Sequence, residues 1–373
     1  NISDETVVVQ WKQNPYYQYF CGEEYFNKSV PCMASELCHF RKRIGEDGME
    51  LILKESIRVN QDDDDPKNPD NDISTCFIDS TVQEKNIAYP TDSKMHNKII
   101  SNILNWSKEY NFPLRQTYKF MLKKLRRDQR FRNHPKNKGK AKKADYKIKT
   151  IAGRLLREFE RNLENFGMRR EFESQISLYQ HVLAQKKDSK QKIYSLHEPD
   201  VVCISKGKSH KKYEFGNKVS IIRSKSGLIV GALSFRNEYD GHTINPALEQ
   251  VRRLTGAVPQ ILAGDRGYRG HKPEEISENT QVVIPSNPKK TDSYYTKKKK
   301  RKLFNLRASI EPIIGHLKSD HRLGRNFYKG VIGDAVNVIL AAAAFNFKRA
   351  MRALFCVFFE WKIGRLFVLS KIA

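Results

Sequence analysis

Three acidic residues stand where a carboxylate could take part in chemistry. Asp79 closes an apolar segment with strand character, "ISTCFIDSTVQ", and Asp265 closes the short apolar segment "AVPQILAGD" beside two glycines. Glu311 lies in "RASIEPIIGHLKSDHR", where the apolar residues have helical spacing. Strand ends and a neighbouring helix can bring distant carboxylates to one edge of a sheet. We therefore expect these three acids to form one site.

A group of carboxylates requires a cation, because like charges that lie close together repel each other. Hard oxygen ligands favour Mg²⁺ or Mn²⁺. Two such ions about 4 Å apart can activate a water or a 3′-hydroxyl and stabilise the leaving oxygen of a phosphodiester. We expect Asp79, Asp265 and Glu311 to bind Mg²⁺ or Mn²⁺, as a pair of ions. The spacing leaves open that each acid is only a turn or capping residue.

Basic residues accompany Glu311 at helical spacing. On a helix, Arg307 lies about 40° and Lys318 about 20° from Glu311 around the axis, so the three share one stripe. Pro312 interrupts this helix, because proline lacks the backbone N–H that a helix interior needs. Either the helix kinks there, or a new helix begins near Glu311 with Pro312 in its first turn.

The chain as a whole is strongly basic, with a formal charge of +26 over 373 residues. Half of that charge lies in residues 115–149, which hold fifteen Lys or Arg against two Asp. Such an excess favours nucleic acid as the partner, with contacts to the phosphate backbone. The alternative is a disordered, solvated tract. The residues that we expect to contact DNA are Lys123, Lys124, Arg126, Arg127, Arg130, Arg132, Lys298, Lys299, Lys300, Arg301, His316 and Arg322.

The patterning around these residues predicts an α/β fold. Residues 5–56 have helical character, and Thr91 and Asp92 cap a helix that begins near Ser93. A basic helical segment is expected to end near residue 130 and to be followed by a loop rich in Gly, Pro and Lys. After this loop we expect a long amphipathic helix over 148–166. "KKYEFGNKVSII" and "LIVGALSF" form a hairpin, and "TQVVIPS" forms a further strand.

The cysteines and the chain ends have simple interpretations. Cys21, Cys32 and Cys38 with His39 could surround a zinc ion, but their irregular spacing favours reduced thiols and a reducing cytoplasm. The sequence begins at Asn1 without a Met, as a fragment or processed chain would. The apolar C-terminal segment is interrupted by charges, so we expect a packed helix and no membrane span.

The helix around Glu311 resembles the Tyr-x2-Arg-x3-Glu-x6-Lys signature of bacterial insertion-sequence transposases of the DDE class. Arg307, Glu311 and Lys318 keep the spacing, and Phe304 occupies the Tyr position. "FIDSTVQEKNIAYPTDSK" and "GDRGYRG" are similar to the blocks around the first and second Asp of that family. These blocks follow one another in the family's order, over residues 5–350.

The resemblance implies an RNase H-like mixed sheet with a large basic helical insertion and a helical N-terminal domain. Arg307 and Lys318 would hold phosphates beside the metal ligands Asp79, Asp265 and Glu311. The expected divisions are a DNA-binding N-terminal region (1–57), an acidic linker (58–72), the first part of the core (73–94), the insertion (95–200), the rest of the core (201–350) and a tail helix (351–373).

The resemblance implies a DNA transposase in the bacterial cytoplasm, associated with the nucleoid. It would cut double-stranded DNA at the terminal inverted repeats of an element and join the ends to target DNA, as a homodimer assembled on DNA. Two alternatives stay open. One is a catalytically inactive or domesticated transposase that only binds DNA. The other is an RNase H-like nuclease that acts on RNA–DNA hybrids, which would leave the Arg/Glu/Lys helix unexplained.

Overall fold

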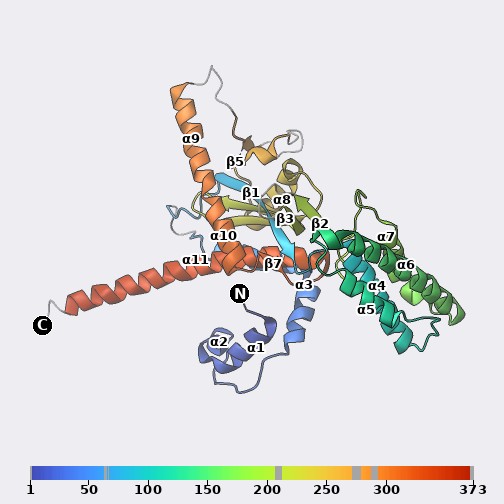
Figure 1. The fold of residues 1–373 in the computed structure, drawn as a ribbon. Helices are drawn as coiled ribbons and strands as arrows, with labels where there is room; N and C mark the ends of the chain where they lie inside the picture. Colours follow the sequence, from blue (N-terminus) through green and yellow to red (C-terminus); the bar gives the residue numbers. More distant parts are fainter. Residues whose placement is uncertain are drawn as a thin grey trace. The chain divides into compact units, whose positions relative to one another are not determined.

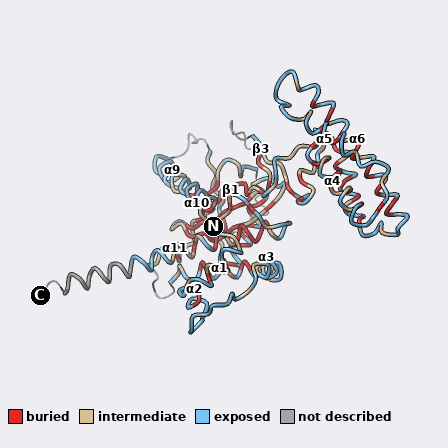
Figure 2. Tube along the Cα trace, turned by 60° about the horizontal axis from the view of Figure 1, so that its bottom comes forward, coloured by how far each residue is buried: buried red, intermediate tan, exposed pale blue. Residues whose placement is uncertain are grey.

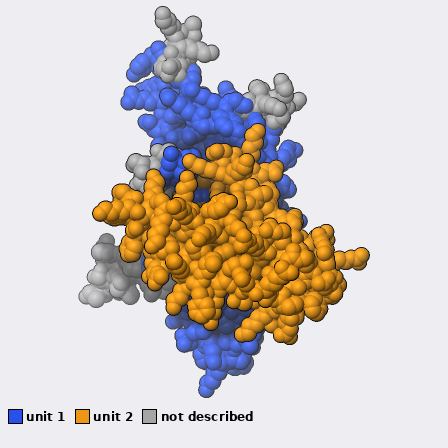
Figure 3. Space-filling model, turned by 45° about the vertical axis from the view of Figure 1, so that its right-hand side comes forward, with its two compact units in different colours: residues 1–86, 204–373 blue, residues 87–203 orange. Residues whose placement is uncertain are grey.

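The structure is a computed structural model and describes residues 2–62, 65, 67–205, 212–270, 279–286 and 293–369, with no side chains for 357–369. It divides into two compact units, which are described separately below (Figure 3). Unit 1 comprises residues 1–86 and 204–373, and unit 2 comprises residues 87–203. The stretch 95–200, expected as a basic helical insertion, falls inside unit 2.

The described part of the chain contains a mixed sheet of seven strands (Figure 1). The strands are β1 (Thr75–Lys85), β2 (Val202–Ser205), β3 (Tyr213–Ser224), β4 (Ile229–Phe235), β5 (Ile261–Ala263), β6 (Gln281–Val283) and β7 (Arg325–Asn326). Their order is β2-β3-β1-β5-β6, with β4 beside β3 and β7 beside β1. β1 runs antiparallel to β3 and parallel to β5, which confirms an α/β fold with a mixed sheet.

The central strand β1 is longer than its sequence indicates. We expected Asp79 at the end of this strand, and that expectation is wrong, because β1 continues to Lys85. Its second half pairs with β3, where Glu84 lies opposite Gly216. The two backbones approach so closely there that a Cβ on Gly216 would lie 1.9 Å from the carbonyl oxygen of Gln83. The expected hairpin is confirmed as β3 and β4.

Seven helices of unit 1 are described, and three of them enclose the main hydrophobic core with the sheet. They are α1 (Asp4–Gln13), α2 (Pro15–Phe20), α3 (Ala34–Arg58), α8 (Ile244–Thr255), α9 (Tyr294–Ala308), α10 (Ile310–Asp320) and α11 (Gly330–Leu369). Buried residues of α3, α8 and α11 pack against the strands in one continuous cluster (Figure 2).

The prediction of helix over residues 5–56 is wrong in two places. Residues 21–33 form turns and irregular structure, where Gly22 has a φ of 93° that ends the preceding helix. Within α3, Gly45 has a φ of 62° and interrupts the helix. Glycine adopts this left-handed conformation without the steric penalty that other residues meet.

The long C-terminal helix α11 is a core helix that continues beyond the sheet (Figure 1). Its part Gly330–Cys356 is long and apolar enough to cross a membrane, but 61% of its apolar window is buried inside the protein. Val338 and Ala342 pack into the main core. We expected the helix after residue 350 to be packed. For the described side chains this expectation is wrong, because α11 extends past the sheet and both Leu354 and Phe355 are exposed.

Unit 2 is helical and has a core of its own. Its helices are α4 (Asp92–Glu109), α5 (Lys119–Asp128), α6 (Pro135–Asn165) and α7 (Glu173–Ala184). Thr91 caps α4 as expected, since its side chain accepts a hydrogen bond from the backbone of Lys94 at 3.3 Å. We expected a loop before the long amphipathic helix, and that expectation is wrong. α6 already begins at Pro135, because proline is well suited to the first turn of a helix.

Candidate active site

Two of the three acids lie at the same level of the sheet. The parallel ladder between β1 and β5 ends at the pair Phe77 and Ala263. Asp79 follows Phe77 by two residues and Asp265 follows Ala263 by two, so each acid lies on the same face as the apolar residue before it. That face is the one on which Phe77 and Ala263 pack with Ile310 in a small buried cluster. The register therefore directs Asp79 and Asp265 toward the segment that carries Glu311.

The chain turns sharply at Asp265. Gly264 is required before it, because a Cβ there would lie 3.1 Å from the ring of Tyr268 and 3.2 Å from Ile78. Asp265 Oδ1 then accepts a hydrogen bond of 2.8 Å from the backbone of Gly267 and caps the short turn Arg266–Tyr268. This bond leaves the second carboxylate oxygen of Asp265 available to other partners.

Glu311 and Arg307 lie on either side of a helix break. α9 ends at Ala308 and α10 begins at Ile310, with Ser309 between them. Pro312 is the third residue of α10, so the second of our two alternatives, a new helix with Pro312 in its first turn, is the correct one. Ile310 is fully buried and fixes the start of α10 against the sheet.

Arg307 connects the acids. Its Nη1 lies 3.4 Å from Asp79 Oδ2, and its Nη2 lies 3.7 Å from Glu311 Oε1. The side chains of Asp79 and Arg307 are 15% and 17% exposed, whereas that of Glu311 is 68% exposed. The carboxylate of Glu311 thus stands at the rim of the site and that of Asp79 at its base.

The surroundings of Asp79 favour its neutral form. Burial and the charge of Asp265 raise the pKa of Asp79 from 3.8 to about 6, and Glu311 adds to the effect. The hydrogen bond from the Ser80 backbone and the charge of Arg307 act in the opposite direction. All three acids and Arg307 therefore interact electrostatically at one place.

A buried arginine that we did not single out in the sequence holds the helix break in place. Arg223 of β3 is 2% exposed, and its guanidinium lies over the ring of Phe77, 4.5 Å from the ring centre. It donates hydrogen bonds to the carbonyl oxygen of Leu306 and to the side chain of Ser309. No local pattern in the sequence indicates this role, because the partners lie more than 80 residues away.

We also did not single out a fourth acid, Asp240, which lies close to Ser80 and Gly267 of the candidate site. It accepts hydrogen bonds from Ser80 Oγ at 3.0 Å and from Lys218 Nζ at 2.8 Å. A Cβ on Gly267 would lie 2.9 Å from Asp265 Oδ1 and 3.4 Å from Asp240 Oδ2.

The basic residues expected to contact DNA lie in both units. All those selected on α5 and in the turn after it are exposed, as are Lys298, Lys299 and Arg301 on α9. His316 instead pairs with Asp320 at 3.1 Å, and Arg322 donates to the backbone oxygen of Ile2 at 2.6 Å. Lys318 follows Glu311 by seven residues on α10, which places it about 10 Å further along the axis.

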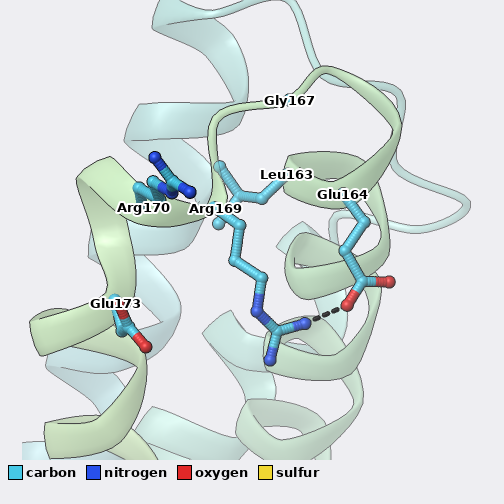
Figure 4. A pocket seen from close by; sticks show the side chains of 6 residues that line it. All are labelled: Leu163, Glu164, Gly167, Arg169, Arg170 and Glu173. Carbon is cyan, nitrogen blue, oxygen red and sulfur yellow. Dashed lines mark hydrogen bonds and ion pairs between the residues drawn. The ribbon is translucent and has the colours of Figure 1, made fainter.

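Other candidate sites in the described ranges lack comparable chemistry. No group of three His, Cys, Asp or Glu among the described residues stands close enough to hold a metal ion. This applies to Cys21, Cys32 and Cys38 and also to Asp79, Asp265 and Glu311 as they stand in this structure. A hollow of about 580 Å³ in unit 2 is lined by Leu163, Gly167 and charged residues (Figure 4). Glu164 and Arg169 form an ion pair there, but both are about half exposed, so this is a solvated surface pair.

Comparison with known proteins agrees with this arrangement. The family model described as "Transposase DDE domain" matches residues 183–347, and a second, "Transposase domain (DUF772)", matches residues 1–43. The first range contains Asp265 and Glu311, whereas Asp79 precedes it.

One similar protein is "Uncharacterized protein ORF8 in nfe locus" of Rhizobium meliloti, which is 38% identical over 124 residues. The match covers 33% of this chain and 59% of that protein. No solved structure matches the chain. The match to a transposase domain over residues 1–43 and the match to a transposase DDE domain over residues 183–347 together indicate an insertion-sequence transposase.

Proposed function

We propose that this protein is an active DNA transposase that cuts the ends of its element and joins them to target DNA. The observation that carries the proposal is that Arg307 pairs with both Asp79 and Glu311, while the charges of Asp265 and Glu311 act on Asp79. Three carboxylates beside a cationic surface fit phosphodiester chemistry better than any other reaction class that the chain offers.

The donor set of this site fits Mg²⁺ or Mn²⁺. Asp79, Asp265 and Glu311 offer hard oxygen ligands, and burial, with the charge of Asp265, raises the pKa of Asp79. These three residues would hold the ions, as a pair. When bound, the ions would neutralise the carboxylates and increase the acidity of a water or 3′-hydroxyl.

The residues of the chain itself would position the DNA. Arg307 presents a planar fork of N–H donors that can bind two phosphate oxygens, and Lys318 adds a point charge further along α10. The exposed residues Lys298, Lys299 and Arg301 of α9, with Lys300, would contact the backbone of the same duplex. The exposed basic residues of α5 in unit 2 would add further contacts to DNA. His316 and Arg322 would be secondary contacts to DNA, since each already has a partner within the protein.

The substrates are double-stranded DNA with the inverted repeats of the element and a target duplex. Two ends must be held together for joining, so we propose that a homodimer assembles on DNA. The working compartment is the bacterial cytoplasm, in contact with the nucleoid.

Cleavage of an end substrate tests the proposal. Asp79→Asn, Asp265→Asn and Glu311→Gln each remove one charge with little change in shape. We expect each to lower Mg²⁺-dependent cleavage by roughly 10²-fold or more, while DNA binding is kept. Glu249→Gln, at an exposed position of α8, is the matched control and should cleave normally. Normal cleavage by any of the three site variants would contradict the role of that residue.

A further inference from the structure

A loop with a partly buried ion pair lies on the face of the sheet opposite to the candidate site. We call residues 239–243 the bracket; it lies between β4 and α8 and includes the short turn Asp240–Thr243. Its acid, Asp240, pairs with Lys218 Nζ at 2.8 Å, and the two side chains are 17% and 26% exposed. An ion pair that is withdrawn from water costs desolvation energy, so stability alone is a weak reason for it.

The bracket is bonded to β1 directly beside Asp79. Asp240 Oδ2 accepts a hydrogen bond of 3.0 Å from Ser80 Oγ, and the backbone N–H of Ser80 donates to Asp79 Oδ1 at 2.8 Å. Side chains alternate between the two faces of a strand, so those of Ser80 and Asp79 point in opposite directions. Lys218 lies on the same face as Ser80, because it is opposite Val82 in the pairing of β1 with β3. The bracket therefore holds β1 from behind the candidate site.

The bracket is also bonded to the segment that follows Asp265. The hydroxyl of Tyr239 donates a hydrogen bond of 2.6 Å to the backbone oxygen of Arg269. A Cβ on Gly267 would lie 3.4 Å from Asp240 Oδ2, so the turn that contains Gly267 lies against the bracket. The same turn orients Asp265, since the backbone N–H of Gly267 donates to Asp265 Oδ1 at 2.8 Å.

We propose that the bracket sets the separation of Asp79 and Asp265, with Asp240 and Tyr239 as positioning residues. The ladder between β1 and β5 ends two residues before each of these acids. Beyond that point the bracket is bonded to both segments that carry them. The inference rests on the proposed function only for what the two acids do, since the link between their segments is present whether or not they bind a metal ion.

Three substitutions weaken the bracket in graded steps. The carboxylate of Asp240 accepts from Lys218 with one oxygen and from Ser80 with the other. An amide has one acceptor oxygen, and its NH2 group only donates, so Asp240→Asn can keep one of these two bonds. Asp240→Ala removes both, and Tyr239→Phe removes only the bond to the backbone of Arg269.

Hydrogen exchange of the full chain, without DNA or divalent ions, tests the link directly. We expect Asp240→Ala and Tyr239→Phe to speed the exchange of the peptide around Gly267 by about 10-fold, the effect of one lost hydrogen bond. Asp70→Ala is the control, because it breaks a similarly buried pair with Arg349 at 2.7 Å and should leave that peptide unchanged. Unchanged exchange around Gly267 in Asp240→Ala, or equally faster exchange in every peptide, would overturn the proposal.

Binding of Mn²⁺ to the chain without DNA, followed by the EPR signal of the free ion, gives a second readout. Loss of a partner that orients metal ligands commonly lowers metal affinity by about 10- to 100-fold. We therefore expect Asp240→Ala to weaken Mn²⁺ binding by about 10-fold or more, Asp240→Asn to lie in between, and Asp70→Ala to bind as the unmodified chain does. Unchanged Mn²⁺ affinity in Asp240→Ala would contradict the positioning role.

The two measurements separate this proposal from the proposed function. If the unmodified chain binds no Mn²⁺ and does not cleave DNA, the proposed function fails, and hydrogen exchange alone decides whether the bracket links the two segments. If the chain cleaves DNA but Asp240→Ala matches it in both measurements, the proposed function stands and the positioning role fails. Asp79→Asn removes a proposed ligand and leaves the bracket intact, so it should weaken Mn²⁺ binding without faster exchange around Gly267.

Discussion

Asp79 combines a functional position with a cost in stability. Its pKa is about 6 in the folded protein against 3.8 for the free side chain, so between these values the folded state binds more protons than the unfolded state. The free energy of unfolding therefore falls as pH rises from 3.8 to 6 and stays lower above that range. The cost arises because the carboxylate of Asp79 is buried beside the charge of Asp265.

Removal of this charge should stabilise the protein. In the absence of divalent ions, we expect Asp79→Asn to raise the free energy of unfolding at neutral pH by up to roughly 3 kcal/mol, the equivalent of the shift. The gain should disappear below pH 3.8, where Asp79 is neutral in both states. Urea unfolding over a pH series measures it. A gain that is independent of pH would show that the charge is not the cause.

Arg223 should act on the site through the helix break that it holds. Arg223→Lys keeps the charge but has too few fixed donors to bond Leu306 and Ser309 together. We expect weaker cleavage and a higher Mg²⁺ requirement with little loss of DNA affinity, measured by cleavage at varied Mg²⁺ and by binding titration. Arg253→Lys, whose partner Glu50 lies away from the site, is the matched control. An unchanged Mg²⁺ requirement would limit Arg223 to a structural role.

At the scale of elements, α9 joins the site to an exposed basic surface. None of its side chains is buried, and its last turn carries Arg307. Leu303 and Leu306 of α9 pack against the sheet, whereas Lys298, Lys299 and Arg301 are exposed and, under the proposed function, would contact DNA bound at the site.

The salt dependence of DNA binding should report this role. We expect Lys298→Gln with Lys299→Gln and Arg301→Gln to weaken binding and to reduce the slope of log K against log salt by about 0.9 for each phosphate that the variant no longer neutralises. Lys186→Gln with Lys187→Gln and Lys190→Gln removes equal charge from unit 2 and is the control. Equal slopes for both variants would show that only the total charge matters.

Elements governed by local signals were predictable from the sequence. The β3–β4 hairpin, the cap at Thr91 and the strand before Asp265 all follow from turn and capping residues close to them. The full length of β1 was not, because its second half is stabilised by pairing with β3, more than 130 residues away. The contacts of Arg223 and Asp240 were missed for the same reason, since side chains that meet across the fold leave no periodic pattern.

At the scale of the whole molecule, a buried ionic network connects α11 to the sheet of unit 1. Lys85 Nζ lies 2.6 Å from Asp334 Oδ1, and both side chains are less than 5% exposed. Asn326 donates to the same oxygen at 2.7 Å, and Arg236 binds the other one. The network links β1, β7 and the end of β4 to the helix that covers them.

Loss of Asp334 should destabilise unit 1 strongly. Asp334→Ala leaves Lys85 charged and buried without its carboxylate, so we expect a loss of about 3–5 kcal/mol in the free energy of unfolding. Urea unfolding would measure it. Glu55→Ala, which breaks the exposed pair with Arg58, should cost less than about 1 kcal/mol. Similar losses for the two variants would mean that the network contributes no more than a surface pair.

The antiparallel pairing of β1 with β3 has a consequence for how this molecule is assembled. Glu84 lies opposite Gly216, so the chain leaves one strand and returns on its neighbour a single strand spacing away, about 5 Å. In a smaller protein a two-residue turn would close that gap. Here unit 2, with its separate core, and the short strand β2 lie between β1 and β3 in the chain. The pairing of β1 with β3 is therefore made between two parts of the chain that a complete helical unit separates.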